Sequence, residues 1–284
     1  MKRTIKTTIK GFRTIDGAGV NLVRVLGNST IEEYDPILML DSFDSVNPDE
    51  YTAGFPMHPH RGIETISYVS RGKMVHRDSL GNEEAIGDGE VQWMNSGSGI
   101  LHEELVPAAD RLLGVQLWLN LPKKEKMSKP SYHSIKREQI EEILVDGGML
   151  RLLAGTYTDG NGMTHEGFKG EHLPLDYYDV HLNTGATITF TMDEDASVML
   201  FTLLGEVHVE GQLVEEKTAV KLTKGTSVTI KAGEGPVQVL YIKSTALHEP
   251  AAWAGPIVMN TEEEVQEAFR ELRNGTFIKE KVEY

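Results

Sequence analysis

Hydrophobic residues in this chain occur in short runs, which glycine or proline interrupts every few positions. The runs are rich in Val, Ile, Thr, Tyr and Phe, which are favoured in β-strands. Many short strands joined by tight turns are typical of sandwiches and barrels. The pattern therefore predicts an all-β fold. Strands are expected through 4–40, then a polar loop at 41–54, one continuous strand from about 55 to Val69, and further strands to 121 and from 148 to about 245.

Residues 123–147 have a different character, with several lysines, Pro130 and a charged stretch that ends in Asp146-Gly147-Gly148. Within this segment, residues 136–144 are expected to be helical. The change in composition predicts a domain boundary. We expect a first domain at 1–130, a linker at 131–147 and a second domain at 148–284.

The C-terminal segment carries the signals of one amphipathic helix. Thr261 and Glu264 have the spacing of a capping box, and the apolar residues that follow recur at helical intervals. Asn274-Gly275 is expected to end the helix. The apolar positions are Val265, Ala268, Phe269 and Leu272.

The second domain is expected to repeat the first. The stretch Gly72-Lys73-Met74-Val75-His76 resembles Gly205-Glu206-Val207-His208, and the segment from Gly89 can be laid without gaps on the segment from Gly225. A duplicated architecture with two β-barrels is the simplest interpretation. This register places His102 on Gln238 and Glu104 on Leu240, whereas counting back from Gly72 and Gly205 places His58 on Thr191 and His60 on Asp193. Only the first barrel is therefore expected to carry chemistry.

Composition and charge restrict the function. The chain has 284 residues and a formal charge of -15, which would repel a phosphate backbone, so no direct nucleic-acid binding is expected. It has no cysteine, which excludes disulfides, thiolate catalysis and cysteine-ligated metal sites. The basic N-terminus lacks the continuous apolar core of a signal peptide, and no run is long enough to cross a membrane. A soluble, cytoplasmic protein is expected.

Two stretches concentrate the residues that can bind a metal. In GFPMHPHRGIETISYV, His58, His60 and Glu64 share one parity, and in GDGEVQWMNSGSGILHEELV so do His102 and Glu104. A strand sends residues i and i+2 to the same face. Buried ionisable groups are normally paired or coordinated, and imidazoles with a carboxylate suit a divalent transition metal. The two stretches predict a mononuclear metal site.

Several alternatives accompany this prediction. The alternation favours Glu104 over Glu103, although a bulge would reverse that choice. His76 could line the mouth of the pocket or be a solvated strand residue, and Arg61 is expected to be structural rather than to bind a substrate. His208 and Glu210 are expected to be exposed at a hairpin tip, and Asp179 and His181 are expected to lack a partner cluster.

Four motifs resemble the pirin family of the cupin superfamily: FPMHPHRGIETISYVSRG, GEVQWMNSGSGILHEE, GVQLWLNLP and AGPIVMNTEEE. The resemblance implies a bicupin of two stacked β-barrels, with one divalent metal in the first barrel and none in the second. Iron is the expected ion, with Ni, Cu, Mn, Co and Zn as alternatives. The implied ligands are His58, His60, His102 and Glu104, whereas Glu64, which general cupins would use, is expected to have a supporting role.

The resemblance also implies two kinds of function. Bacterial members include quercetin 2,3-dioxygenases, which cleave a flavonol with O2, and here Glu104 would serve as ligand and base. Phe55, Met57 and Trp93 are candidates for the apolar walls of a polyphenol pocket. The eukaryotic namesake resembles a nuclear transcriptional cofactor, so the alternative is a non-catalytic, redox-sensing metal protein that binds a partner protein.

Overall fold

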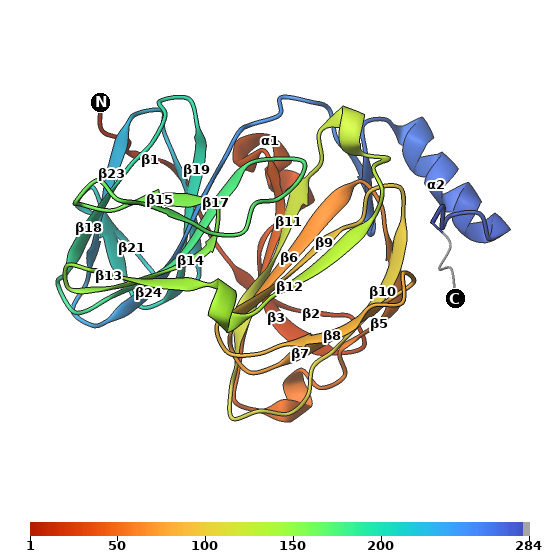
Figure 1. Ribbon diagram of the computed structural model, residues 1–284, viewed down its shortest axis with the longest axis horizontal. Coiled ribbons are helices and arrows are strands. Elements are labelled where there is room, and N and C mark those ends of the chain that lie inside the picture. The colour runs from red at the N-terminus through yellow and green to blue at the C-terminus, as the bar shows by residue number, and fades with distance from the viewer. Residues whose placement is uncertain (281–284) are drawn as a thin grey trace. The chain divides into compact units, whose positions relative to one another are not determined.

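The chain folds into two compact β units in a computed structural model that describes residues 1–280 (Figure 1). The first unit contains Arg13–Glu32, Ile37–Lys136 and the chain from Leu247 onward. The second contains Met1–Phe12, Glu33–Pro36 and Arg137–Ala246. We call these units the first barrel and the second barrel. The prediction of an all-β fold with a short C-terminal helix is confirmed.

The first barrel consists of a seven-stranded and a four-stranded antiparallel sheet. The larger sheet has the order β12-β9-β6-β11-β4-β3-β2, and the smaller has the order β5-β10-β7-β8. Buried apolar side chains such as Phe43, Val69 and Leu112 fill part of its interior. The strands are β2 Phe12–Asp16, β3 Val20–Leu26, β4 Ile37–Ser45, β5 Phe55–His60, β6 Ile63–Arg71, β7 Met74–Asp78, β8 Glu83–Ile86, β9 Glu90–Asn95, β10 Ile100–Leu105, β11 Leu112–Asn120 and β12 Ser131–Ile135.

The second barrel has the same construction, with a seven-stranded sheet in the order β1-β22-β19-β24-β17-β14-β13 and a four-stranded sheet in the order β18-β23-β20-β21. A hairpin of β15 Thr156–Thr158 and β16 Thr164–Glu166 is attached to it. The other strands are β1 Ile5–Lys10, β13 Glu141–Val145, β14 Gly148–Ala154, β17 Leu175–Leu182, β18 Thr187–Thr191, β19 Ser197–Leu204, β20 Val207–Val209, β21 Gln212–Val214, β22 Thr218–Leu222, β23 Ser227–Ala232 and β24 Val237–Ser244.

The matching sheet orders confirm the repeat but correct its register. The gapless alignment from Gly89 and Gly225 places β9 on β23 and β10 on β24, whereas the sheet orders make β23 the counterpart of β10. Turn glycines recur after most strands, so a gapless match of glycines cannot distinguish one hairpin from the next. Counting from Gly72 and Gly205 through the paired strands gives different counterparts: Phe190 for His58, Met192 for His60, Val228 for His102 and Ile230 for Glu104.

The two ends of the chain do not belong to the halves that the linear division gave them. The first strand, β1, pairs with β22 in the second barrel, and the C-terminal segment belongs to the first. The expected helix at 136–144 is wrong, because this stretch forms a 3-10 turn at Arg137–Gln139 and then strand β13. In β13 only Ile143 is buried, so its charged residues lie on the exposed side of an edge strand rather than on a helix.

The C-terminal helix α2, Glu262–Asn274, is confirmed with both of its predicted ends. The Thr261 side chain accepts a hydrogen bond from the Glu264 amide, and the Glu264 carboxylate accepts one from the Thr261 amide. Gly275 ends the helix with φ 70°, a left-handed conformation that glycine adopts easily. The apolar face of α2 packs on the short hairpin β25 Ala252–Ala254 and β26 Ile257–Met259. Within residues 1–280, no helix has the length and apolar character needed to span a bilayer.

Candidate metal centre

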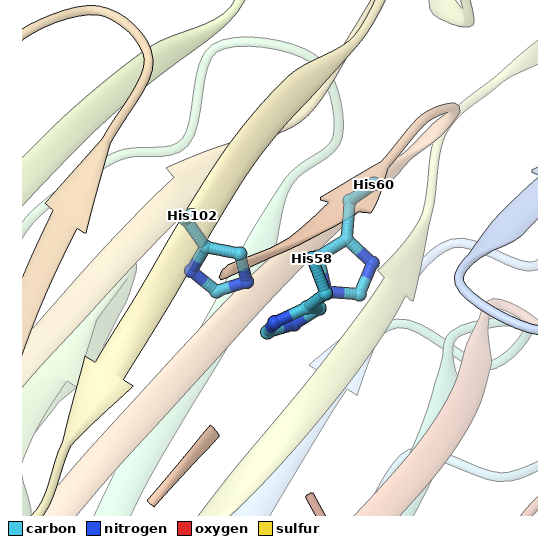
Figure 2. Close-up of side chains that lie close together, drawn as sticks. All are labelled: His58, His60 and His102. Atoms are coloured by element: carbon cyan, nitrogen blue, oxygen red, sulfur yellow. The ribbon is translucent and has the colours of Figure 1, made fainter. Parts of the chain in front are cut away.

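Three histidine rings of the first barrel lie close together (Figure 2). His58 and His60 lie on β5, and His102 lies directly opposite His58 on β10. Each ring offers one nitrogen, and these nitrogens all lie within 4.8 Å of one another. The strand spacing thus brings together the three histidines that the sequence predicted as ligands.

The hydrogen bonds of His58 and His60 leave two lone pairs facing each other. Nδ1 of His58 lies 2.9 Å from the Pro56 carbonyl, and Nδ1 of His60 lies 3.0 Å from that of Pro256. A carbonyl only accepts, so each Nδ1 carries the proton and each Nε2 is left as a lone pair. The two Nε2 atoms are 3.1 Å apart. Two nitrogens at about 2.1 Å from one ion and at a right angle would lie about 3.0 Å apart, so the pair fits a divalent metal.

Burial keeps the imidazoles of His60 and His102 in the neutral form that binds a metal. Desolvation, together with the neighbouring His58, lowers the pKa of His60 to about 3. Desolvation and the rings of His60 and His58 hold the pKa of His102 well below its usual value. Among the described residues, the buried Nε2 of His102 has no hydrogen-bond partner. A buried lone pair of this kind is costly unless something binds it, which supports a cation at this point.

Glu104 is buried and lines the same cavity as His58 and His60, but it does not belong to the group of facing ligand atoms, and its carboxylate is held by amides. Gln116 donates to Oε1 and Oε2 at 3.1 and 3.0 Å. Gln92 donates to Oε1, with the Ser67 hydroxyl 3.5 Å away. The neighbouring Glu103 is turned outward toward Arg77, at 3.4 Å. The predicted alternation, with Glu104 inside, is therefore confirmed.

Glu64 does not share the strand of His58 and His60. The extended backbone is interrupted at Gly62, which has φ 79°, and the strands on either side, β5 and β6, belong to different sheets. The prediction of one continuous strand to Val69 is wrong, because Gly62 adopts a conformation that ends the extended segment. Glu64 is buried on β6, but parity along one strand cannot relate it to the two histidines. The expected polar loop at 41–54 also starts later, since β4 continues to Ser45.

A cavity of about 660 Å³ opens onto the cluster, a size typical of small-molecule pockets. Phe55 lines it as expected. Met57 does not, being 53% exposed, and Trp93 is buried away from the cavity. The apolar lining that the sequence did not identify is Met39, Phe43, Trp118 and Trp253.

An ion-pair network forms one side of the cavity. Arg24 donates to both carboxylate oxygens of Asp41, at 2.9 and 2.7 Å, and to Asp16 at 2.6 Å. All three residues line the cavity. With two carboxylates on one guanidinium, the network carries a net charge of −1 and offers carboxylate acceptors to a ligand with hydroxyl groups.

The sequence could have indicated some of the residues that it missed. Gln92 and Gln116 are amides in the middle of otherwise apolar strands, and each points to Glu104. An inward polar residue on such a strand requires a partner, so its presence is a usable signal. Trp253 gave no such signal, because it reaches the cavity from the C-terminal segment, far away in the sequence.

The remaining candidates are placed as follows. His76 is neither solvated nor at the cavity mouth; it is fully buried beside His102. Arg61 is structural, because it donates to the Ser98 and Phe277 carbonyls and to Glu271 of α2. Glu210 forms an ion pair with Lys2 at 3.1 Å.

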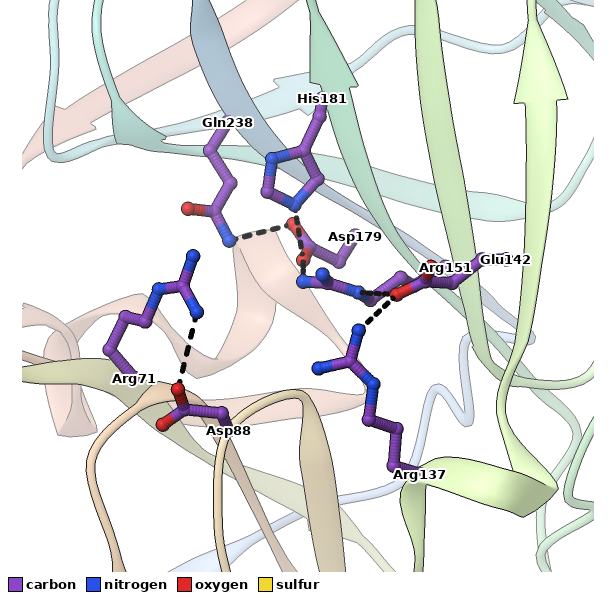
Figure 3. Close-up of polar contacts among 8 residues, drawn as sticks. All are labelled: Arg71, Asp88, Arg137, Glu142, Arg151, Asp179, His181 and Gln238. Carbon is purple, nitrogen blue, oxygen red and sulfur yellow. Dashed lines mark hydrogen bonds and ion pairs between the residues drawn. The ribbon is translucent and has the colours of Figure 1, made fainter.

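Asp179 and His181, expected to lack a partner cluster, belong to no group of metal ligands among the described residues, but they do have hydrogen-bonding partners. His181 donates to Asp179 at 2.7 Å, and Gln238 and Arg151 also reach the Asp179 carboxylate (Figure 3). These residues come from β14, β17 and β24, so they are brought together by strand pairing rather than by sequence proximity. The cluster contains one carboxylate and one histidine, and a metal site needs more ligands than that.

Comparison with known proteins identifies the family. The Pirin family model matches residues 19–119, and the model of the pirin C-terminal cupin domain matches 177–278. A Pseudomonas aeruginosa protein, provisionally named a quercetin 2,3-dioxygenase, is 37% identical over 270 residues, which cover 93% of this chain and 94% of the relative. A "Pirin-like protein" of Caulobacter vibrioides is 38% identical over 278 residues, covering 97% and 99%.

A crystal structure of quercetin 2,3-dioxygenase from Acinetobacter baumannii has the same fold. It superimposes with a TM-score of 0.88 at 30% identity, covering 98% of this chain and 99% of that one. The predicted bicupin architecture is thereby confirmed. Both family models and these full-length relatives agree on one assignment. The chain belongs to the pirin family.

Proposed function

We propose that this protein is a metal-dependent dioxygenase that cleaves a flavonol or a similar phenol with O2, and that iron is its working ion. The observation that carries the proposal is the set of three facing histidine nitrogens beside a cavity with aromatic walls, which Glu104 also lines. Relatives and a structural neighbour named as quercetin 2,3-dioxygenases support it. His58, His60, His102 and Glu104 would hold the ion.

The protein residues would divide the work as follows. A bound divalent ion would supply Lewis acidity to the phenolic hydroxyl and redox chemistry with O2. Glu104 would accept the hydroxyl proton, because its carboxyl group lies in the cavity wall. Trp118 donates to the oxygen of the Gln116 amide at 3.2 Å, which turns the amide nitrogen toward Glu104. This chain of hydrogen bonds would keep the carboxylate in place.

The walls of the cavity fit a flat, hydroxylated aromatic compound. Phe43, Phe55, Trp118 and Trp253 offer apolar and aromatic surface, while Asp16 and Asp41 offer acceptors to ring hydroxyls. These features support a flavonol as the substrate class.

The test is oxygen uptake by the metal-loaded protein with quercetin, together with loss of the flavonol absorbance. We expect Glu104→Gln to lower the rate by about 100-fold or more, as loss of a general base does. Glu103→Gln is the matched control, because its carboxylate faces Arg77 rather than the cavity, and it should keep the wild-type rate. Equal rates for wild type and Glu104→Gln would refute the role of Glu104, and no turnover by the iron-loaded wild type would refute the activity.

The second candidate is a non-catalytic, redox-sensing metal protein that binds a partner protein. It is favoured by the relatives that carry only a pirin name at a similar identity. It predicts that the metal-loaded protein captures a partner in one oxidation state of the ion and not in the other, without consuming O2 in the presence of quercetin. The oxygen-uptake measurement therefore separates the two functions.

A further inference from the structure

A buried histidine that is outside the proposed ligand set links His102 to a carboxylate. His76 lies on β7 next to β10, and its Nδ1 is 3.4 Å from Nδ1 of His102. Its other nitrogen, Nε2, is 2.8 Å from Oδ2 of Asp78. Tyr132 stacks on the His76 ring with centroids 3.9 Å apart and planes at 8°, which holds the ring in its plane.

Asp78 is built to act only as an acceptor. Its Oδ1 accepts the backbone amides of Leu80 and Asn82, at 2.8 and 3.1 Å, and its Oδ2 also accepts the Asn82 side-chain amide at 2.9 Å. Burial alone would raise the pKa of Asp78, but hydrogen bonds from His76 and Asn82 hold this pKa below its ordinary value. The side chains of both Asp78 and His76 are 0% exposed. A buried carboxylate that accepts four hydrogen bonds is held in one orientation.

The order of donors and acceptors fixes two tautomers in succession. Asp78 accepts, so the His76 proton lies on Nε2 and its Nδ1 must accept. Nδ1 of His102 then donates to Nδ1 of His76, and the lone pair of His102 is left on Nε2, the buried atom that has no partner in the described part of the chain. This is the nitrogen that the other two histidines also turn toward the cluster.

We propose that Asp78 and His76 are positioning residues that set the tautomer of His102, so that its Nε2 lone pair faces the metal. The proposal rests on the metal site proposed above. Outer hydrogen bonds of this kind orient metal-bound histidines in many proteins, but here the acceptor is itself a histidine. For His58 and His60 the acceptors are carbonyls, which cannot change role, whereas His76 accepts only as long as Asp78 does.

The sharpest test is Asp78→Asn, which is nearly isosteric. The two backbone amides would keep the Asn oxygen at the Oδ1 position, so the new NH2 group would face Nε2 of His76. His76 would then carry its proton on Nδ1, and His102 would carry its proton on Nε2, where it blocks the metal. We expect Ni²⁺ affinity, measured by calorimetry, to fall about 10- to 100-fold, as outer-shell substitutions do.

A second variant shows whether Asp78 acts through His76. His76→Leu removes the intermediate ring, and we expect Asp78→Asn to add no further loss of Ni²⁺ affinity in that background. Asp88→Asn is the matched control, since Asp88 accepts the Gly72 amide at 2.7 Å and pairs with Arg71 without touching a histidine (Figure 3). It should bind Ni²⁺ as wild type does. An equal loss from Asp78→Asn in both backgrounds would overturn the proposal.

A spectroscopic measurement on the metal-free wild type needs neither a variant nor activity. Nitrogen-15 chemical shifts should place the His76 proton on Nε2 and the His102 proton on Nδ1, and in Asp78→Asn both should move to the other nitrogen. The opposite tautomers in the wild type would overturn the relay. If the tautomers are as expected but quercetin is not consumed, the relay stands and only the proposed activity fails.

Discussion

The two barrels have the same strand order, but the interior of the first is partly polar and that of the second is apolar. The proposed ligands of the first barrel correspond to apolar residues in the second, and so do the groups that hold Glu104. Strand pairing matches Gln92 with Val220, Ser67 with Leu200 and Gln116 with Tyr241, in addition to the counterparts of the four proposed ligands, which are Phe190, Met192, Val228 and Ile230. The difference teaches that this architecture does not need a polar interior to fold.

The core of the second barrel is a large cluster of buried apolar side chains. Phe190, Val228 and Ile230 belong to one continuous buried cluster, in which Tyr178 and Tyr241 stack with centroids 4.9 Å apart. Each fully buried aliphatic side chain contributes about 1.5–3 kcal/mol. The first barrel gives up several such contributions for imidazoles and amides that must be hydrogen-bonded or coordinated. The polar interior of the first barrel is therefore not explained by packing stability alone.

The largest effect is expected when a proposed ligand of the first barrel is replaced by its counterpart from the second. His102→Val removes one of the three facing nitrogens, and Ni²⁺ affinity should fall by more than about 100-fold, beyond the range of outer-shell changes. The metal-free protein should remain folded, because valine is the residue that packs at this point in the second barrel. Calorimetry and metal analysis after dialysis measure the loss, and undiminished binding would remove His102 from the site.

The reverse exchange should damage stability instead of creating a site. Val228→His puts an imidazole among apolar neighbours that offer no acceptor, and its cost should be about 2–4 kcal/mol in the free energy of unfolding. Urea unfolding of the metal-free variants measures it, with His102→Val as the partner measurement. A variant that gains tight Ni²⁺ binding would show that the second barrel retains a usable ligand set.

The polar network around Glu104 should be energetically coupled, unlike its apolar counterpart. Gln92→Val leaves a carboxylate short of a donor, and Glu104→Ile leaves two amides short of an acceptor. The double variant should therefore be more stable than the two single effects predict, with a coupling of about 1–3 kcal/mol. The matched cycle of Val220→Ala with Ile230→Val should give a coupling near zero. Additive effects at Gln92 and Glu104 would contradict the importance of their hydrogen bond.

The smallest effect concerns one buried lysine in each barrel. Burial lowers the pKa of Lys126 to about 7 and that of Lys221 to about 8. Each folded-state value lies below the unfolded value of 10.5, so the unfolded state binds more protons between these limits and stability should rise with pH there. The slope should be about 1 kcal/mol per pH unit from about pH 7 for Lys126 and from about pH 8 for Lys221. Urea unfolding from pH 6.5 to 10 measures the free energy of unfolding against pH. Lys126→Met should reduce the slope above about pH 7, and Lys221→Met should reduce it above about pH 8. An unchanged slope in both variants would contradict the shifts.

Local patterns predicted the elements whose cause is local. The capping box at Thr261 and Glu264 depends only on neighbouring residues and was confirmed in detail. The alternation along β10 also placed Glu104 inside and Glu103 outside. The helix predicted at residues 136–144 was wrong because its structure depends on distant strands. A charged stretch at the edge of a sheet has no apolar face that distinguishes a strand from a helix.

The sequence by itself determined that the chain is all-β, that it contains a repeat, and that His58, His60, His102 and Glu104 are the candidates for metal binding. These conclusions follow from periodicity and residue chemistry, which each short stretch carries on its own. Tertiary structure alone decided the register of the repeat, the end of β5 at Gly62, and the assignment of each chain end to the other barrel. It also decided the contacts of Gln92, Gln116, Trp253 and His76. Those features depend on which strands pair across long distances, and pairing is a property of the whole sheet that no single segment specifies.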